Sequence, residues 1–193
     1  MLLSVVDAIQ DQGILIDIVQ NSDCLEAREK AVRKIKNERV LCNIAQKDFE
    51  KVALAAVESV HDEKLLYDIA MNAPGFYVKK AAIEKITNQE CLHKLALDFF
   101  GGFVVSGIDN EDILFDIFAN ASTYNQTRIE ALSKLSNIER LYSIASNTSE
   151  ELIVKIAVEK ISDKNLLLDI AKNAKLWYTR EIAIEKLYCC NKR

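Results

Sequence analysis

Two similar stretches decide the fold: "LLYDIAMNAPGFYVKKAAIEKI" at residues 65–86 and "LLLDIAKNAKLWYTREIAIEKL" at residues 166–187. They are identical at 12 of 22 positions without a gap. Both first halves contain L-x-D-I-A, and both second halves contain A-I-E-K before a final aliphatic residue. Similarity of this kind within one chain indicates a repeat architecture.

The two halves recur along the chain with a period of about 26 residues, which lies in the range of helical repeats. Within each half, apolar residues stand at i, i+3 and i+4, the spacing of an amphipathic helix. We call the two predicted helices of each repeat A and B. The anchor of helix A stands at Ile18, Ile44, Ile69, Leu95, Ile117, Ile144 and Ile170, and helix B ends at Ile9, Ile35, Val60, Ile86, Ile108, Leu135, Ile161 and Leu187.

One helical hairpin cannot bury both of its apolar stripes, whereas stacked hairpins cover one another. The pattern therefore predicts an all-α chain, an α-α superhelix (solenoid) of about seven helical hairpins with an N-terminal half-repeat. We expect residues 1–193 to form a single repeat domain.

Polar residues separate the predicted helices. An Asn or Asp before helix A is expected to cap its N-terminus through a side-chain oxygen, and an Asn after helix A is expected to take the left-handed conformation that ends many helices. The N-caps are Asn37, Asp62, Asn88, Asn110, Asn137 and Asp163, and the terminal residues are Asn21, Asn72, Asn120, Asn147 and Asn173.

The B helices "YVKKAAIEKI" from Tyr77, "TRIEALSKL" from Thr127 and "YTREIAIEKL" from Tyr178 resemble HEAT-type repeats, especially the short repeats of the phycobilisome lyases. In that family, helix B often opens with an aromatic residue or valine followed by Arg and an Ala-rich apolar run. The resemblance covers nearly the whole chain. It implies the fold, while arrays of this kind serve many functions.

Alternate repeats carry an acid in helix A and a basic residue at the start of helix B. The resemblance implies a ladder of such pairs that sets the curvature of the array, and ordinary surface charge is the alternative. The predicted pairs are Asp17 with Arg28, Asp68 with Lys79, Asp116 with Arg128, and Asp169 with Arg180.

The fourth repeat, at about residues 89–110, departs from the pattern at "DFFGGFVVSGIDN" (98–110). Its anchors lie 13 residues apart, where other repeats use 16 to 18. We therefore expect a helix B that is about one turn short, entered through Gly101 and Gly102 and weakened by Gly107. Phenylalanines are expected to fill the gap. The stretch is either a decayed repeat or a hinge or notch in which Phe99 or Phe103 is open to a ligand.

Composition narrows the function. The net charge of −4, with both signs mixed, gives no reason to expect nucleic acid, and no apolar run is long enough to span a membrane. Five irregularly spaced cysteines suggest free thiols in a reducing, cytoplasmic setting. No group of residues has the spacing of a metal site, so we expect no metal, cofactor or catalytic residues.

Exposed positions of helix B are expected to line the concave wall of the array. Acidic side chains with interleaved apolar ones suit a basic, partly apolar peptide, while a lysine column (Lys34, Lys85, Lys134, Lys160 and Lys186) complements helix C-termini. Of the aromatics at the A–B turns, Phe76 and Trp177 are expected to pack onto the turn as a staple. The wall candidates are Glu58, Tyr77, Glu84, Phe99, Ile129, Leu152, Glu159, Tyr178 and Glu185.

These features predict a non-enzymatic scaffold that binds a protein or peptide. The resemblance also permits two other functions. One is a subunit of a lyase or chaperone-like enzyme complex, and the other is a nucleic-acid-binding DNA-repair protein, which would need a basic groove.

Overall fold

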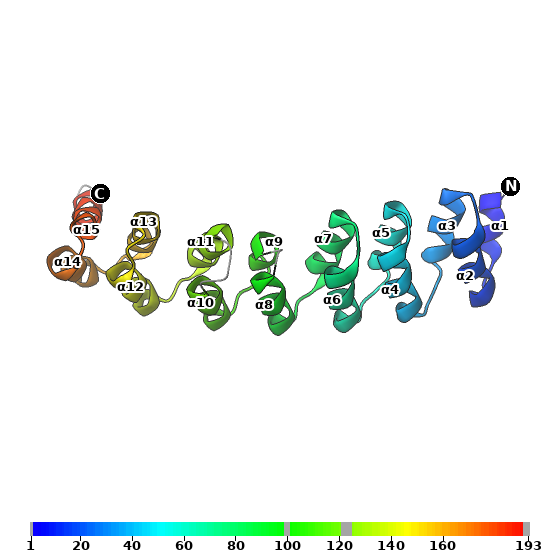
Figure 1. Ribbon diagram of the computed structural model, residues 1–193, viewed down its shortest axis with the longest axis horizontal. Coiled ribbons are helices and arrows are strands. Elements are labelled where there is room, and N and C mark those ends of the chain that lie inside the picture. Colours follow the sequence, from blue (N-terminus) through cyan, green and yellow to red (C-terminus); the bar gives the residue numbers. More distant parts are fainter. Residues whose placement is uncertain (1, 99–100, 121–124, 191–193) are drawn as a thin grey trace. The chain divides into compact units, whose positions relative to one another are not determined.

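The computed structural model describes residues 2–98, 101–120 and 125–190, which form helices joined by short turns (Figure 1). Packing divides the chain into two compact units, residues 1–92 and residues 93–193, and each is described by itself. In the described residues, one helix is followed by seven A–B pairs in chain order. The predicted all-α fold of consecutive packed helix pairs is therefore confirmed. The single domain over residues 1–193 stays a prediction.

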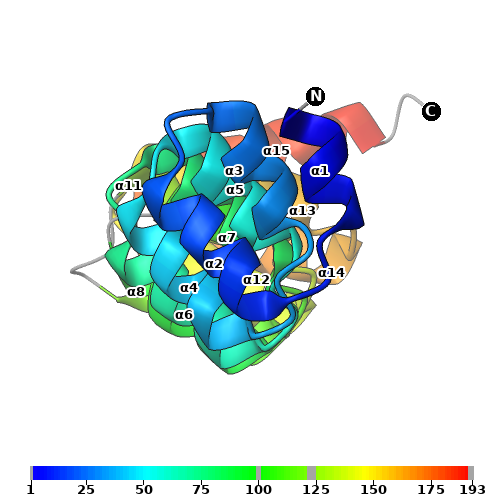
Figure 2. The same cartoon turned by 90° about the vertical axis from the view of Figure 1, so that its right-hand side faces the viewer.

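In the first unit, α1 packs on α3, each A helix packs on the B helix that follows it, and successive B helices pack on one another. Figure 2 shows α3, α5 and α7 in one layer and α2, α4 and α6 in the other. The helices are α1 (Leu2–Ala8), α2 (Gln12–Asn21), α3 (Leu25–Val32), α4 (Glu38–Lys47), α5 (Glu50–Glu58), α6 (Glu63–Asn72), α7 (Phe76–Lys85) and the first part of α8 (Gln89–Leu97).

The second unit repeats this arrangement, with α10 on α11, α12 on α13, α14 on α15, and the B helices α9, α11, α13 and α15 in contact in that order. After the remainder of α8, its helices are α9 (Gly101–Val105), α10 (Glu111–Ala119), α11 (Asn125–Lys134), α12 (Ile138–Asn147), α13 (Glu151–Lys160), α14 (Lys164–Asn173) and α15 (Trp177–Cys190).

The predicted anchors form much of the core of each unit. Ile69 and Val60 are fully buried in the first unit, and Ile117 and Leu135 are fully buried in the second. Burying one aliphatic side chain of this size stabilises the folded chain by roughly 1.5–3 kcal/mol. The stripes that the sequence period defines are therefore the faces on which the hairpins pack.

The predicted N-caps are confirmed at all six positions. Asp62, for example, accepts hydrogen bonds from the backbone N–H groups of Lys64 and Leu65, and Asn88 accepts from those of Glu90 and Cys91. Asn37, Asn110, Asn137 and Asp163 cap their helices in the same way.

The prediction of left-handed Asn residues is wrong, because no described residue has a positive φ. The residues that follow four of these asparagines, such as Ala73 and Ala174, are extended, and Asn120 is itself extended, so the chain leaves these helices without a left-handed turn. Three of the Asn amides donate instead to an Asp side chain one turn earlier, and the Asn147 amide donates to the Ser143 carbonyl. Asn21 donates to Asp17, Asn72 to Asp68 and Asn173 to Asp169, each at 2.7 Å.

The short helix B of the fourth repeat is α9, which spans only five residues and packs on α11. Gly107 lies beyond the end of α9, so the expectation that it weakens the helix from within is wrong. Phe103 is 49% exposed and does not fill a gap in the core. Phe99 lies outside the described residues.

Candidate functional site

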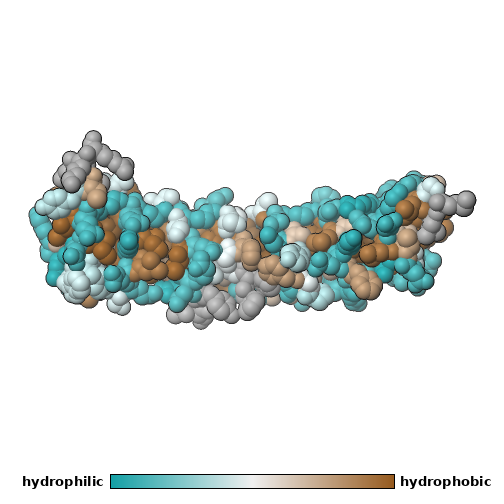
Figure 3. Space-filling model, turned by 90° about the horizontal axis from the view of Figure 1, so that it is seen from above, coloured by the Kyte–Doolittle hydropathy of each residue, from teal (hydrophilic) through white to brown (hydrophobic). Residues whose placement is uncertain are grey.

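The B helices of each unit present a continuous layer of side chains, and Figure 3 looks onto this layer. Apolar patches alternate there with polar side chains within each unit. We call this surface the B face and define it by the exposed residues of α5 and α7 in the first unit and of α11, α13 and α15 in the second.

In the first unit, the B face has a hollow of about 390 Å³ between α5 and α7. Tyr77, which is 61% exposed, and Glu84 line it together with Leu54 and Lys80. The Lys80 ammonium lies 3.7 Å from the Glu84 carboxylate. Glu58, another predicted wall residue, is exposed and pairs with Arg33, which directly follows α3.

In the second unit, a small hollow between α11 and α13 is lined by the predicted residues Ile129 and Leu152. A larger hollow of about 470 Å³ lies between α13 and α15. We call it the C-terminal groove. Its lining comprises Glu151, Lys155, Val158, Glu159, Trp177, Tyr178, Glu181, Ile182, Glu185, Lys186 and Cys189.

The C-terminal groove contains three of the predicted residues (Glu159, Tyr178 and Glu185), and it also contains residues that the prediction omitted, such as Trp177 and Glu181. Trp177, Glu181 and Glu185 succeed one another at intervals of four on α15, so they share one helix face. That spacing is the sequence signal that could have found them.

The lysine column does not neutralise the groove by pairing with its acids. Lys186 Nζ donates to the backbone carbonyl of Glu159 at the end of α13, the preceding B helix. Lys34, Lys85, Lys134 and Lys160 contact the C-terminal carbonyls of the preceding B helix in the same way. These contacts confirm the predicted interaction of the lysine column with helix C-termini. They show that each lysine contacts the C-terminus of the preceding B helix.

The acids of the C-terminal groove have carboxylates that are paired with no other described residue. They are Glu151, Glu159, Glu181 and Glu185. The groove has only two basic residues, Lys155 and Lys186, to balance these four acids, and the Lys186 ammonium donates to a backbone carbonyl. The groove therefore carries a net negative charge beside an aromatic pair, of which Trp177 is exposed and Tyr178 is half-buried.

The expectation that Phe76 and Trp177 pack onto the turn is wrong, because they are 46% and 67% exposed. A staple requires the hydrophobic residue to precede the N-cap, whereas these residues are the first of α7 and α15. Each ring instead stands edge-on to the next tyrosine, with centroids 5.7 Å apart at Tyr77 and 5.9 Å apart at Tyr178. The Tyr178 hydroxyl donates to the Ser149 carbonyl at 2.7 Å, which fixes its ring at the groove.

The predicted pairing of acid and basic residue within a repeat is also wrong. The acids of the third, fifth and seventh repeats accept from the preceding A helix: Gln46 donates to Asp68 at 2.7 Å, His93 Nε2 lies 2.7 Å from Asp116, and Tyr142 donates to Asp169. Asp17, in the first repeat, accepts from Asn21.

The basic residues of the predicted pairs form hydrogen bonds and ion pairs at the ends of helices. Lys79, Arg128 and Arg180 donate to carbonyls at the C-terminus of their own helix A, at 2.8, 3.0 and 2.7 Å. Carbonyls at that position lack partners within the helix, so a long cationic side chain one turn into helix B satisfies them. Arg28 and Arg128 also pair with Asp48 and Glu150, which precede the next helix B.

Cys42 contributes to the same A-helix contacts, with its Sγ 3.5 Å from Asp68 Oδ2. Burial, followed by the nearby Asp68 carboxylate, raises the pKa of the Cys42 thiol to about 11. The thiol therefore stays protonated near neutral pH and acts as a donor rather than as a nucleophile.

Among the residues that the structure describes, no three His, Cys, Asp or Glu side chains are grouped so that they could hold a metal ion. The described helices also include none with the length and apolarity needed to cross a membrane. The chain matches no protein-family model, no curated protein and no solved structure.

Proposed function

We propose that this protein is a non-enzymatic scaffold of the HEAT type that binds a basic, partly apolar peptide segment of another protein on its B face. The observation that carries the proposal is the C-terminal groove, where exposed Trp177 and ordered Tyr178 stand among four unpaired glutamates. Exposed Trp and Tyr are frequent anchors of protein interfaces, and the acidic rim complements lysine or arginine in the bound segment.

The same chemistry is present on the first unit, where Tyr77 and Leu54 lie beside Glu84 and Glu50. A segment that occupies the B face of either unit would meet aromatic and acidic groups in alternation. The thiols of Cys24, Cys42, Cys91 and Cys189 are free, which supports a reducing compartment such as the cytoplasm.

Selection of a random peptide library on the purified chain tests this proposal. We expect the enriched peptides to combine Arg or Lys with an aromatic or large aliphatic residue, and we expect their affinity to fall as salt concentration rises because the pairing is electrostatic. Affinities of one enriched peptide for each variant can then be measured by fluorescence anisotropy.

Trp177→Ala should weaken the binding of that peptide at least tenfold, equivalent to about 1.4 kcal/mol or more of binding free energy. Leu168→Ala is the matched control, because Leu168 is also an exposed apolar residue of the second unit but lies on α14, away from the groove. Glu181→Gln together with Glu185→Gln should reduce the salt dependence, whereas Glu139→Gln on α12 should not. Equal binding by wild type and Trp177→Ala would rule out the groove.

A further inference from the structure

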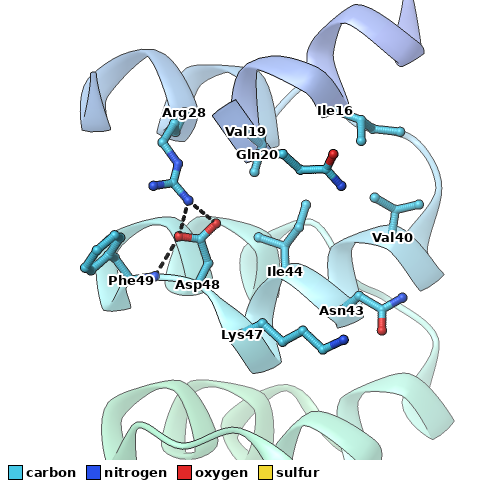
Figure 4. Close-up of a pocket in the computed structure, with 10 residues that line it drawn as sticks. All are labelled: Ile16, Val19, Gln20, Arg28, Val40, Asn43, Ile44, Lys47, Asp48 and Phe49. Carbon is cyan, nitrogen blue, oxygen red and sulfur yellow. Dashed lines mark hydrogen bonds and ion pairs between the residues drawn. The ribbon is translucent and has the colours of Figure 1, made fainter. Parts of the chain in front are cut away.

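A hollow of about 660 Å³ lies in the first unit, on the side of the A helices (Figure 4). We call it the α2–α4 pocket. Helices α2 and α4 form its walls, and the start of α3 with the turn between α4 and α5 closes one end. Volumes of this size are typical of small-molecule sites. The lining residues are Ile16, Val19, Gln20, Arg28, Val40, Asn43, Ile44, Lys47, Asp48 and Phe49.

The pocket does not follow simply from the repeat geometry. The equivalent position in the second unit, between α10 and α12, retains a hollow of only about 290 Å³. There, Phe115 and Phe118 occupy the places that Ile16 and Val19 have in the first unit, and Arg128 lies over the Phe118 ring at 5.4 Å. Two smaller aliphatic side chains therefore open the α2–α4 pocket.

The residues that line the α2–α4 pocket divide into an aliphatic middle and two polar ends. At one end, Arg28 Nη2 lies 2.5 Å from both carboxylate oxygens of Asp48, and the Arg28 guanidinium lies over the ring of Phe49 at 5.5 Å. Figure 4 shows the ends of Gln20, Asn43 and Lys47 on the other side, with Val19 and Ile44 between.

Several donors of this pocket lack an acceptor. The amides of Gln20 and Asn43 and the ammonium of Lys47 contact no other described residue through a hydrogen bond or an ion pair. Arg28 Nε is buried and is also without a partner among the described residues. Asp48 balances Arg28, so Lys47 leaves the lining with one uncompensated positive charge. Of these donors, only Arg28 Nε is buried, and a buried donor without an acceptor is costly. Gln20, Asn43 and Lys47 are exposed at the mouth of the pocket, where their donors can exchange water for the oxygen acceptors of a ligand.

We propose that the α2–α4 pocket binds an aliphatic monocarboxylate of the class of medium-chain fatty acids. Its carboxylate lies among Lys47, Asn43 and Gln20, and its chain crosses Val19 and Ile44 towards Phe49, which is 69% exposed. One negative charge matches the excess charge of the lining, and the hydrocarbon chain covers the aliphatic middle, where its burial is favourable. This site belongs to the first unit and is independent of the C-terminal groove.

Isothermal titration of the full chain with octanoate, below the concentration at which it forms micelles, tests the proposal. We expect saturable binding of one octanoate. Octylammonium has the same chain with the opposite charge, and acetate has the carboxylate without the chain, so neither should bind measurably. Lys47→Met replaces the lysine by an unbranched side chain without charge, and it should weaken the binding of octanoate roughly tenfold through loss of the charge.

The second unit supplies a sharper variant. Ile16→Phe with Val19→Phe copies the Phe115 and Phe118 arrangement, so it should fill the pocket, abolish octanoate binding and leave the thermal midpoint unchanged or raised. If that variant does not fold, as judged by circular dichroism, the comparison of Lys47→Met with wild type decides. Equal affinity for octanoate and octylammonium, or unchanged affinity in Lys47→Met, would overturn the proposal. Trp177→Ala should bind octanoate as wild type does, which separates this site from the peptide groove.

Discussion

At the scale of single residues, Gly101 shows why the fourth repeat departs from the pattern. A Cβ on Gly101 would lie 2.0 Å from Thr127 Oγ1 and 2.7 Å from Thr127 Cβ, so α9 approaches α11 too closely for any side chain. The neighbouring Gly102 differs, since its Cβ would meet only the Glu130 carboxylate at 3.1 Å, the mobile end of a long side chain. The glycine pair thus has one member that packing requires and one that it does not.

This difference predicts opposite effects of the same substitution. Gly101→Ala should destabilise the chain by about 1–3 kcal/mol, because α9 must move away from the buried Thr127. Gly102→Ala should be neutral or stabilising by up to about 1 kcal/mol, since Ala favours the helix. Urea unfolding of both variants measures the effect, and equal stability of the two would mean that α9 does not sit on α11 as described.

At the scale of helices, the first residue of several A helices accepts hydrogen bonds from the turn that opens the next repeat. Glu38 accepts from the backbone N–H groups of His61 and Asp62, at 2.9 and 2.8 Å. Glu63 accepts from the hydroxyl and the backbone N–H of Thr87. In the second unit, Glu111 accepts from the Ser136 N–H at 2.7 Å. These carboxylates tie one repeat to the next without any apolar contact.

The junctions make stability depend on pH. Hydrogen bonds from the backbone of Asp62 and His61 lower the pKa of Glu38, and hydrogen bonds from the Thr87 hydroxyl and N–H lower the pKa of Glu63. A carboxyl whose pKa is lower in the folded state adds stability above its unfolded pKa of about 4.3–4.5 and loses that contribution as pH falls through the folded pKa. The thermal midpoint should therefore drop on acidification below this range.

Glu38→Gln with Glu63→Gln provides the test by calorimetry. The double variant should melt below wild type at neutral pH, and the gap should close in acid as the wild-type carboxyls take up protons. Glu90→Gln is the control, because Glu90 also stands in the first turn of an A helix but its carboxylate bonds to no other described residue. A gap that persists in acid would show that the carboxylate charges do not stabilise the junctions.

At the scale of the whole molecule, features set by neighbours in sequence could be predicted and features set between repeats could not. The helices and the N-cap at Asp62 depend on residues no more than four positions apart in the sequence, so the sequence pattern predicts them. The partners of Asp116 and Asp169 lie 23 and 27 residues away, and only the register between A helices brings His93 and Tyr142 to them. On the B face, Tyr178 and Glu185 follow from helix periodicity, whereas the outward position of Trp177 depends on where α15 begins.

The same local organisation governs how the chain unfolds. Within each unit, helices pack on helices one or two places away in the chain, so a repeat is stabilised by its neighbours and not by a common core.

Leu66 on α6 and Leu141 on α12 occupy equivalent positions in the two units, and each is 1% exposed. Leu→Ala at such a site costs about 2–5 kcal/mol. We expect Leu66→Ala to speed amide hydrogen exchange in α4–α7 while α12–α14 keep wild-type protection, and Leu141→Ala to do the reverse. Mass spectrometry of both variants measures this, and faster exchange throughout the chain in either one would instead show a single cooperative unit.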